Sequence, residues 1–120
     1  MKFSDGVEIS FRLDSHDNVD DTIDAIRRLD IGGGNTNIAL ALRTARTRMF
    51  PVRPNSTTDF VIPRLLILVT DGTATAESAR TLPEANLTKA AGIHIFTVRQ
   101  MLLFRRCLLR LVICPIAIIA

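Results

Sequence analysis

A carboxylate at the end of a buried strand is the first feature of this sequence that could do chemistry. The run Leu65–Val69 is apolar throughout, and Thr70-Asp71-Gly72 follows it directly. An uninterrupted apolar run is typical of a central parallel strand that is buried on both faces. In open α/β sheets, ligands bind beyond the carboxyl ends of the strands, which is where Asp71 is placed. Asp71 is therefore a candidate ligand-binding residue, and the alternative is that Asp71-Gly72 only forms a turn.

A hydroxyl group beside a run of glycines is the second candidate. Thr36 follows Gly32-Gly33-Gly34 and stands at the start of a helical pattern that opens with Asn35-Thr36-Asn37. Glycines allow a ligand or another loop to approach closely, whereas the alternative role of Thr36 is to cap the helix. The glycines match neither G-x-G-x-x-G nor the phosphate loop G-x-x-x-x-G-K-[ST]. The sequence thus gives little support to a phosphate-transfer enzyme.

Other polar clusters have structural explanations. Asp20, Asp21 and Asp24 fall in the first turns of a predicted helix, where the helix dipole favours negative charge, and the spacing of a calcium-binding EF-hand is absent. His16 and His94 are isolated, and no nucleophile with a paired base is visible. We therefore expect no enzymatic activity.

The amino-terminal half must position Thr36. Asp5-Gly6 predicts a hairpin turn, and alternating side chains predict a half-buried strand over Val7–Leu13. A helix follows that Asp17 or Asn18 can cap. Apolar residues at helical spacing mark the inner stripes of this helix and the next: Val19, Ile23, Ile26 and Leu29, then Ile38, Leu42, Ala45 and Met49.

The second half must position Asp71. Prolines and small polar residues predict a surface loop over residues 51–63, before the buried strand. A short helix is predicted over Pro83–Ala91, with Gly92 as its carboxyl-terminal stop, and a second buried strand over Ile93–Val98. Strand, helix and strand at this spacing form a parallel crossover unit. The pattern favours an α/β domain.

The formal net charge of +3 does not indicate a nucleic-acid-binding protein. Three arginines, Arg105, Arg106 and Arg110, lie in the last twenty residues, and the rest of the chain is near neutral. No basic face precedes them and aromatic residues are few, so nucleic acid is not an expected partner.

The amino terminus does not predict a secretory signal. MKFSDGVEIS, at the amino terminus, lacks the apolar segment of a signal peptide, so the location of this product is not predicted. Asn55-Ser56-Thr57 and Asn86-Leu87-Thr88 are glycosylation sequons, which matter only if the chain is secreted. Asn55 and Asn86 are therefore candidate glycosylation sites.

Three segments together resemble a known domain family. They are GGGNTNIALALRTARTRMF, RLLILVTDG and AAGIHIFTV, and they occur in this order. Residues 1–98 resemble the von Willebrand factor A domain, particularly the collagen VI and matrilin type. The resemblance implies a doubly wound, Rossmann-like α/β fold, with a mostly parallel sheet and helices on both faces. It also implies an adhesion or extracellular-matrix protein-binding module, with a matrix component such as collagen as partner and an extracellular location for the parent family.

The resemblance assigns a metal-binding role to Thr36 and Asp71. In that family a divalent ion, usually magnesium, is held by a D-x-S-x-S motif after the first strand, a threonine in the second loop and the aspartate of T-D-G. Thr36 and Asp71 match the last two positions. Hydroxyl and carboxylate oxygens are the ligands that Mg²⁺ prefers, and an open coordination position can accept a partner's carboxylate.

One departure from the family concerns this site. No D-x-S-x-S motif occurs in the chain, so the resemblance implies an incomplete site with weak or no Mg²⁺ binding. The family places that motif on its first, central strand, and we expect this strand to be missing from a partial domain at residues 1–98. Asp14-Ser15 resembles the motif superficially but follows the hairpin strand and lacks the second serine. The alternative is a non-functional partial product, from an altered splice end or a gene-model fragment.

The tail, residues 99–120, has no counterpart in the family. Its apolar run, Leu111–Ala120, is ten residues long, about half of a membrane span. Cys107 and Cys114 have no further ligand at metal-binding spacing. Three interpretations stay open: a membrane anchor within residues 101–120, an unrelated end from altered splicing or gene modelling, or a strand over Leu111–Ile119 that packs against the exposed sheet.

Overall fold

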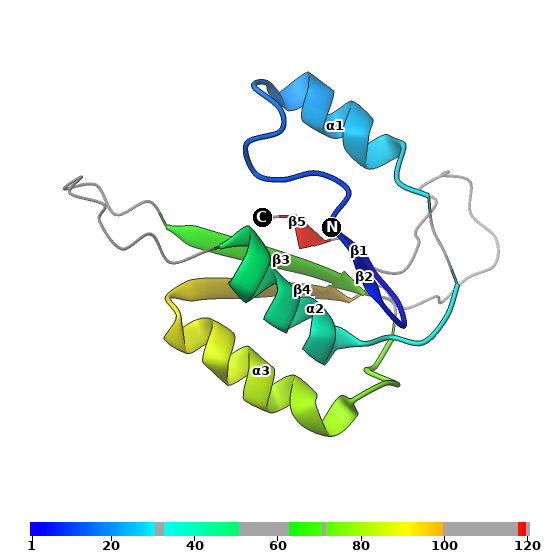
Figure 1. The fold of residues 1–120 in the computed structure, drawn as a ribbon, viewed down its shortest axis with the longest axis vertical. Helices are drawn as coiled ribbons and strands as arrows, with labels where there is room; N and C mark the ends of the chain where they lie inside the picture. The colour runs from blue at the N-terminus through cyan, green and yellow to red at the C-terminus, as the bar shows by residue number, and fades with distance from the viewer. Residues whose placement is uncertain (31–32, 51–62, 71, 100–117, 120) are drawn as a thin grey trace.

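The computed structural model describes residues 1–30, 33–50, 63–70, 72–99 and 118–119, and residues 51–62 of the predicted surface loop lie outside them. Figure 1 shows a sheet with helices packed on it and a separate amino-terminal hairpin. The elements, in order, are β1 (Lys2–Phe3), β2 (Val7–Glu8), α1 (Val19–Arg27), α2 (Ile38–Thr44), the π-helical turn η1 (Ala45–Met49), β3 (Arg64–Thr70), α3 (Ser78–Ala90), β4 (Ile93–Arg99) and β5 (Ile118–Ile119).

The amino-terminal hairpin forms at the predicted turn but is shorter than predicted. β1 and β2 are antiparallel, with Lys2 opposite Glu8 and Phe3 opposite Val7. The Lys2 ammonium and the Glu8 carboxylate form an ion pair at 3.2 Å. The predicted strand over Val7–Leu13 is wrong beyond Glu8, because the short β1 leaves the later residues without a paired strand in the described part of the chain. Burial lowers the pKa of the Met1 α-amino group, and the Glu8 carboxylate opposes this shift.

The sheet is organised around β3, as the apolar run predicted. β4 is parallel to β3 in a register that places Leu65 opposite His94 and Val69 opposite Val98. The β3–α3–β4 order confirms the predicted parallel crossover and the α/β class. Leu66 and Leu68 are buried against the helices, which accounts for the apolar character of the strand.

β5 occupies the edge of β3 away from β4. Ile118 and Ile119 pair antiparallel with Leu68 and Ile67 of β3. Of the three interpretations of the tail, this pairing supports the strand, over these two residues. Residues 100–117, with Cys107, Cys114 and the three tail arginines, lie outside the described residues. Within the described ranges, no helix is long and apolar enough to cross a membrane.

Helix α3 packs against α2 and against β4, and α2 shares a hydrophobic core with β3. The predicted stripe of the second helix is confirmed, because Ile38, Leu42, Ala45 and Met49 are all buried. They meet Phe3, Leu66 and Ile93 in a single core. On the opposite face of the sheet, Leu65, Phe96 and Val98 remain exposed, so in the described part of the chain α2 and α3 leave that face partly open.

Helix α3 begins five residues earlier than predicted. It starts at Ser78, and Pro83 lies inside it rather than in its first turn. The ring costs the helix one main-chain hydrogen bond, and the exposed position of Pro83 gives the ring room. Gly92 has a φ of +77° and ends the helix as predicted, because glycine adopts left-handed backbone without strain.

Helix α1 is capped as predicted, but its apolar stripe is not buried. The Asn18 side chain accepts a hydrogen bond from the Asp21 main-chain nitrogen, so Asn18 is the cap rather than Asp17. No residue of α1 is buried, and Val19 and Ile23 are exposed. The predicted inner stripe is therefore wrong at these two positions. Helical spacing identifies an apolar stripe but does not establish that another element lies against it.

Candidate functional site

Two loops far apart in the sequence are joined at the carboxyl end of β3. The Thr36 main-chain N–H donates to the Thr75 hydroxyl at 2.8 Å. In return, the Thr36 carbonyl accepts from the main-chain N–H groups of Thr75 at 3.1 Å and Ala76 at 3.4 Å. The loop that precedes α2 is thus held against the loop that follows β3. This is the edge at which the sequence predicted a site.

Thr36 leaves its hydroxyl available at this edge. The N-cap of α2 is Asn37, whose side-chain oxygen accepts from the Leu40 main-chain nitrogen at 2.9 Å. The alternative in which Thr36 caps the helix is therefore wrong, because the residue after it takes that role. No described residue forms a hydrogen bond with the Thr36 hydroxyl, whereas both main-chain polar groups of Thr36 are engaged. The side chain is half-buried and can offer one oxygen to a ligand.

Asn37 and Glu77 form a second connection between the loops. Asn37 is 5% exposed, and its side-chain nitrogen donates to the Glu77 carboxylate at 3.2 Å. Glu77 also accepts from Arg80 at 3.2 Å. Its φ of 47° and ψ of 36° are left-handed, a strained conformation for a residue that is not glycine. The sequence did not predict this connection, because a single left-handed glutamate leaves no periodic signal.

Asp5 holds the glycine loop from the hairpin side. Its carboxylate accepts from the Asn35 side-chain nitrogen at 2.7 Å and from the Asn35 main-chain nitrogen at 3.3 Å. Gly34 has a φ of +132°, and a Cβ atom there would overlap the Asp5 carboxylate. The predicted close approach at the glycines is thus seen at Gly34, where the approaching group is the Asp5 side chain. Asp5 was assigned only to a turn by sequence, and its role in positioning the loop is a finding of the structure.

Asp71, the second predicted metal ligand, lies outside the described residues. Its two neighbours in the chain are described. The buried Thr70 hydroxyl donates to the Gly72 carbonyl at 3.2 Å and accepts from the Gly72 main-chain nitrogen at 3.3 Å. These bonds belong to the loop that Thr75 joins to Thr36.

The other polar residues singled out by sequence are not brought to this edge. The Ser15 hydroxyl accepts from the Arg12 main-chain nitrogen at 2.9 Å, and Ser15 lines a cleft beneath α1. Asp20 and Asp21 lie in the first turn of α1, and Asp24 pairs with Arg27, in agreement with a role in helix stability. His94 lies within β4 as predicted and is exposed.

Of the two candidate glycosylation sites, only Asn86 is described. It is exposed in the middle of α3. The Thr88 hydroxyl of the same sequon is fully buried and donates to the Glu84 carbonyl at 2.8 Å. Asn55 lies outside the described residues.

The donor set at the edge fits a magnesium ion only in part. The Thr36 hydroxyl has the right chemistry and has no hydrogen-bond partner among the described residues, but Mg²⁺ requires about six oxygen ligands in octahedral geometry. Within the described ranges, no group of three or more His, Cys, Asp or Glu side chains is placed to hold a metal ion.

Comparison with known proteins identifies a family for this chain. The family model for the von Willebrand factor type A domain matches residues 1–101. The human von Willebrand factor A domain-containing protein 2 is 33% identical over 98 residues, which cover 82% of this chain and 12% of that protein. The chain thus spans a small part of this relative's length. No solved structure gives a significant match. The chain belongs to the von Willebrand factor type A domain family.

Proposed function

We propose that the chain is a protein-binding module of the collagen VI and matrilin type, which adheres to an extracellular-matrix component such as collagen. The family supports this proposal, because its domains are generally protein-interaction and adhesion modules and are generally not enzymes. The binding surface would be the edge where the Thr36 loop meets the loop that follows β3.

The pairing of Thr36 with Thr75 is the main support for this proposal. The reciprocal hydrogen bonds between Thr36 and Thr75 hold two loops together while leaving the Thr36 hydroxyl without a hydrogen-bond partner among the described residues. A polar group whose position is set by its own main chain is pre-organised for a ligand, because little conformational entropy is lost on binding. Asp5 and Glu77 support the same loops from either side.

We propose that Thr36 and Asp71 form an incomplete metal site at this edge. Domains of this family often bind a divalent metal through a metal-ion-dependent adhesion site. Bound Mg²⁺ would supply positive charge that attracts a carboxylate of the partner. With one hydroxyl and one carboxylate from the protein, the ion keeps most of its water. We therefore expect a Kd no better than millimolar, equivalent to about 4 kcal/mol.

Binding of the full chain to immobilised collagen VI, with Mg²⁺ or with EDTA, tests the proposed function. We expect saturable binding that falls about fivefold or more in Thr36→Ala, because the substitution removes the free hydroxyl at the edge. Thr47→Ala is the matched control, since Thr47 is an exposed threonine whose hydroxyl donates to the Arg43 carbonyl one turn earlier, away from the edge. Equal binding by wild type and Thr36→Ala would overturn the assignment of the edge, and no binding to collagen VI would overturn the choice of ligand.

A further inference from the structure

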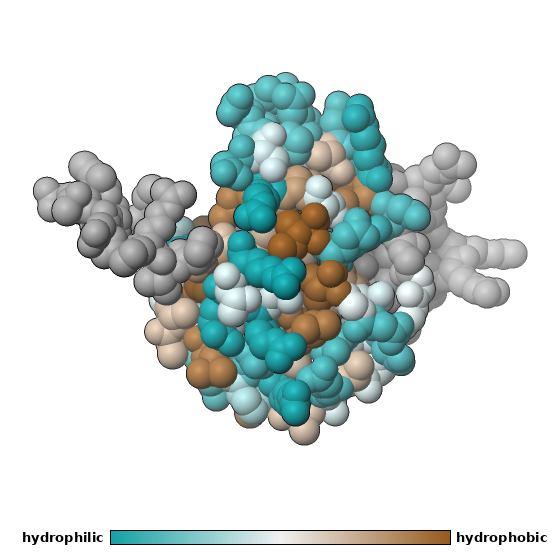
Figure 2. Space-filling view, viewed as in Figure 1, coloured by the Kyte–Doolittle hydropathy of each residue, from teal (hydrophilic) through white to brown (hydrophobic). Residues whose placement is uncertain are grey.

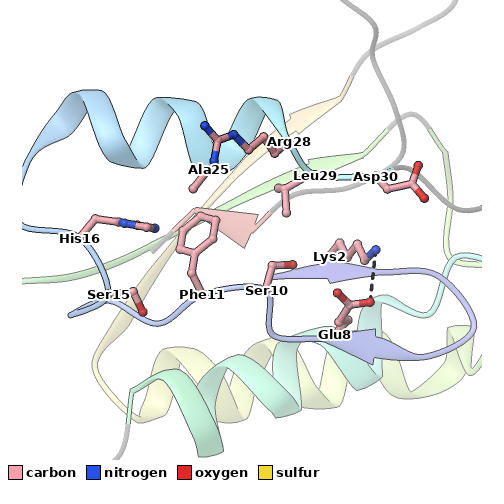
Figure 3. Close-up of a pocket in the computed structure, with 10 residues that line it drawn as sticks. All are labelled: Lys2, Glu8, Ser10, Phe11, Ser15, His16, Ala25, Arg28, Leu29 and Asp30. Atoms are coloured by element: carbon pink, nitrogen blue, oxygen red, sulfur yellow. Dashed lines mark ion pairs between the residues drawn. The ribbon is translucent and has the colours of Figure 1, made fainter.

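A cleft between α1 and the hairpin lies apart from the proposed binding edge. Its volume is about 610 Å³, within the range of small-molecule sites. Residues of the hairpin and of the chain that follows it form one wall, and the end of α1 forms the other (Figure 3). Thr36, Thr75, Asn37 and Glu77 are not among its lining residues. The cleft is therefore a separate candidate site.

The middle of the cleft is apolar. Phe11 lines it from below, Ala25 lines it from α1, and Leu29 lines it from the segment that follows α1. The Phe11 ring meets the His16 ring edge-on, with ring centroids 5.3 Å apart and an interplanar angle of 64°. Figure 2 shows apolar surface between α1 and α2, flanked by hydrophilic surface. An apolar strip of this kind suits the hydrocarbon or aromatic part of a ligand.

One end of the cleft has polar groups without partners. The Nε2 atom of His16 is buried and makes no hydrogen bond to another described residue. A buried polar atom without a hydrogen bond destabilises the folded state, and a ligand that forms this hydrogen bond would remove the penalty. Arg28 lines the same cleft, is exposed, and forms no ion pair with another described residue. In Figure 3, His16 and Arg28 lie toward the same end.

The cation at the other end of the cleft is already paired. Lys2 and Glu8 form an ion pair there at 3.2 Å. Asp30 also lines this end of the cleft and already has an interaction partner in the chain. The cation available to a ligand is therefore Arg28. Its guanidinium matches the two oxygens of a carboxylate, which accept two parallel hydrogen bonds.

We propose that this cleft binds a small amphiphilic carboxylate. The apolar body lies on Phe11 and Leu29, and the carboxylate lies between Arg28 and His16. One free arginine balances one negative charge, whereas a phosphate dianion would need further cations to offset its desolvation. Binding requires a side-chain movement that exposes His16 Nε2, because this atom is buried in the structure.

Titration of the ¹⁵N-labelled full chain with 4-phenylbutyrate tests the proposal, with 4-phenylbutylamine as the cationic control. We expect saturable shifts of the His16 ring nitrogens and of the main-chain amides of Arg28 and Leu29 with the carboxylate. The amine should give no saturable shift, since Arg28 repels it. Absence of shifts with millimolar 4-phenylbutyrate, or equal binding of the amine, would overturn the proposal.

A matched pair of charge variants separates a specific site from general attraction. Arg28→Gln should weaken 4-phenylbutyrate binding about tenfold. Arg27→Gln should leave it unchanged, because Arg27 neighbours Arg28 but does not line the cleft. Both positions are exposed, so neither substitution disturbs the core, and an unchanged spectrum outside α1 verifies folding. Equal loss in the two variants would contradict a specific role for Arg28.

Discussion

Thr36 and Thr75, 39 residues apart in the chain, exchange hydrogen bonds in both directions at the carboxyl end of β3. This pairing joins the glycine-rich loop before α2 to the loop after β3. It engages the main chain of Thr36 and leaves the side chain to a ligand. The proposed binding edge therefore depends on contacts that the two loops make with each other.

Replacing Thr75 by valine should loosen this connection. The two side chains have nearly the same shape, but a valine side chain could not accept the hydrogen bond from the Thr36 main-chain nitrogen. We expect a loss of about 1 kcal/mol in the free energy of unfolding, measured with urea, and faster hydrogen exchange at the Thr36 amide. Thr73→Val is the control, because Thr73 lies in the same loop and is exposed. Unchanged exchange at the Thr36 amide would show that the Thr75 bond does not hold the loop.

Gly34→Ala should disrupt the Asp5 contact that holds the glycine loop. A Cβ atom at this position overlaps the Asp5 carboxylate, and the φ of +132° is strained for alanine. We expect the free energy of unfolding to fall by about 2 kcal/mol, measured in urea. Gly33→Ala is the matched control, since a Cβ atom there meets no atom within 4 Å. If the two variants were equally stable, Asp5 would not constrain the loop as described.

The ion pair between η1 and α3 should contribute more than a surface pair does. Arg46 and Glu84 meet at 2.8 Å, and their side chains are only 24% and 16% exposed. Glu84→Gln keeps the shape but removes the charge opposite a largely buried guanidinium, and should destabilise the fold by about 2 kcal/mol in urea unfolding. Asp24→Asn removes the exposed pair with Arg27 and should cost less than about 0.5 kcal/mol. Equal costs would contradict the difference in burial.

Magnesium and manganese titrations measure the completeness of the metal site. Isothermal titration calorimetry on the wild-type chain should give a Kd of about 1 mM or weaker, because Thr36 and Asp71 supply only two of about six oxygens. Asp71→Ala should abolish even this weak binding. Micromolar binding that vanishes in Asp71→Ala would show that other oxygens, such as those of a second chain, complete the site.

The parts of the fold that sequence could predict are those governed by local chemistry. The apolar run of β3, the Asp5-Gly6 turn, the buried stripe of α2 and η1, and the stop at Gly92 all appear as predicted. Each follows from a single segment and needs no knowledge of distant contacts.

The parts that sequence could not predict depend on choices between similar residues or on distant neighbours. Thr36 and Asn37 are both good caps, and only the structure shows that Asn37 caps α2 and that the Thr36 hydroxyl has no hydrogen-bond partner among the described residues. α3 begins at Ser78, directly after the left-handed Glu77, whereas Pro83 suggested a later start. The exposed stripe of α1 depends on what lies opposite the helix, which its own spacing does not encode.

Mapping of ligand contacts by amide chemical shifts would show whether a ligand binds at the edge where the Thr36 and Thr75 loops meet. The ¹⁵N-labelled full chain would be titrated with a triple-helical collagen peptide in the presence of Mg²⁺. We expect the perturbed amides to cluster in residues 33–37 and 72–77, and we expect Thr36→Ala to weaken these shifts while Thr47→Ala does not. Perturbations confined to the open face of the sheet, around Leu65, Phe96 and Val98, would contradict the assignment of the binding edge.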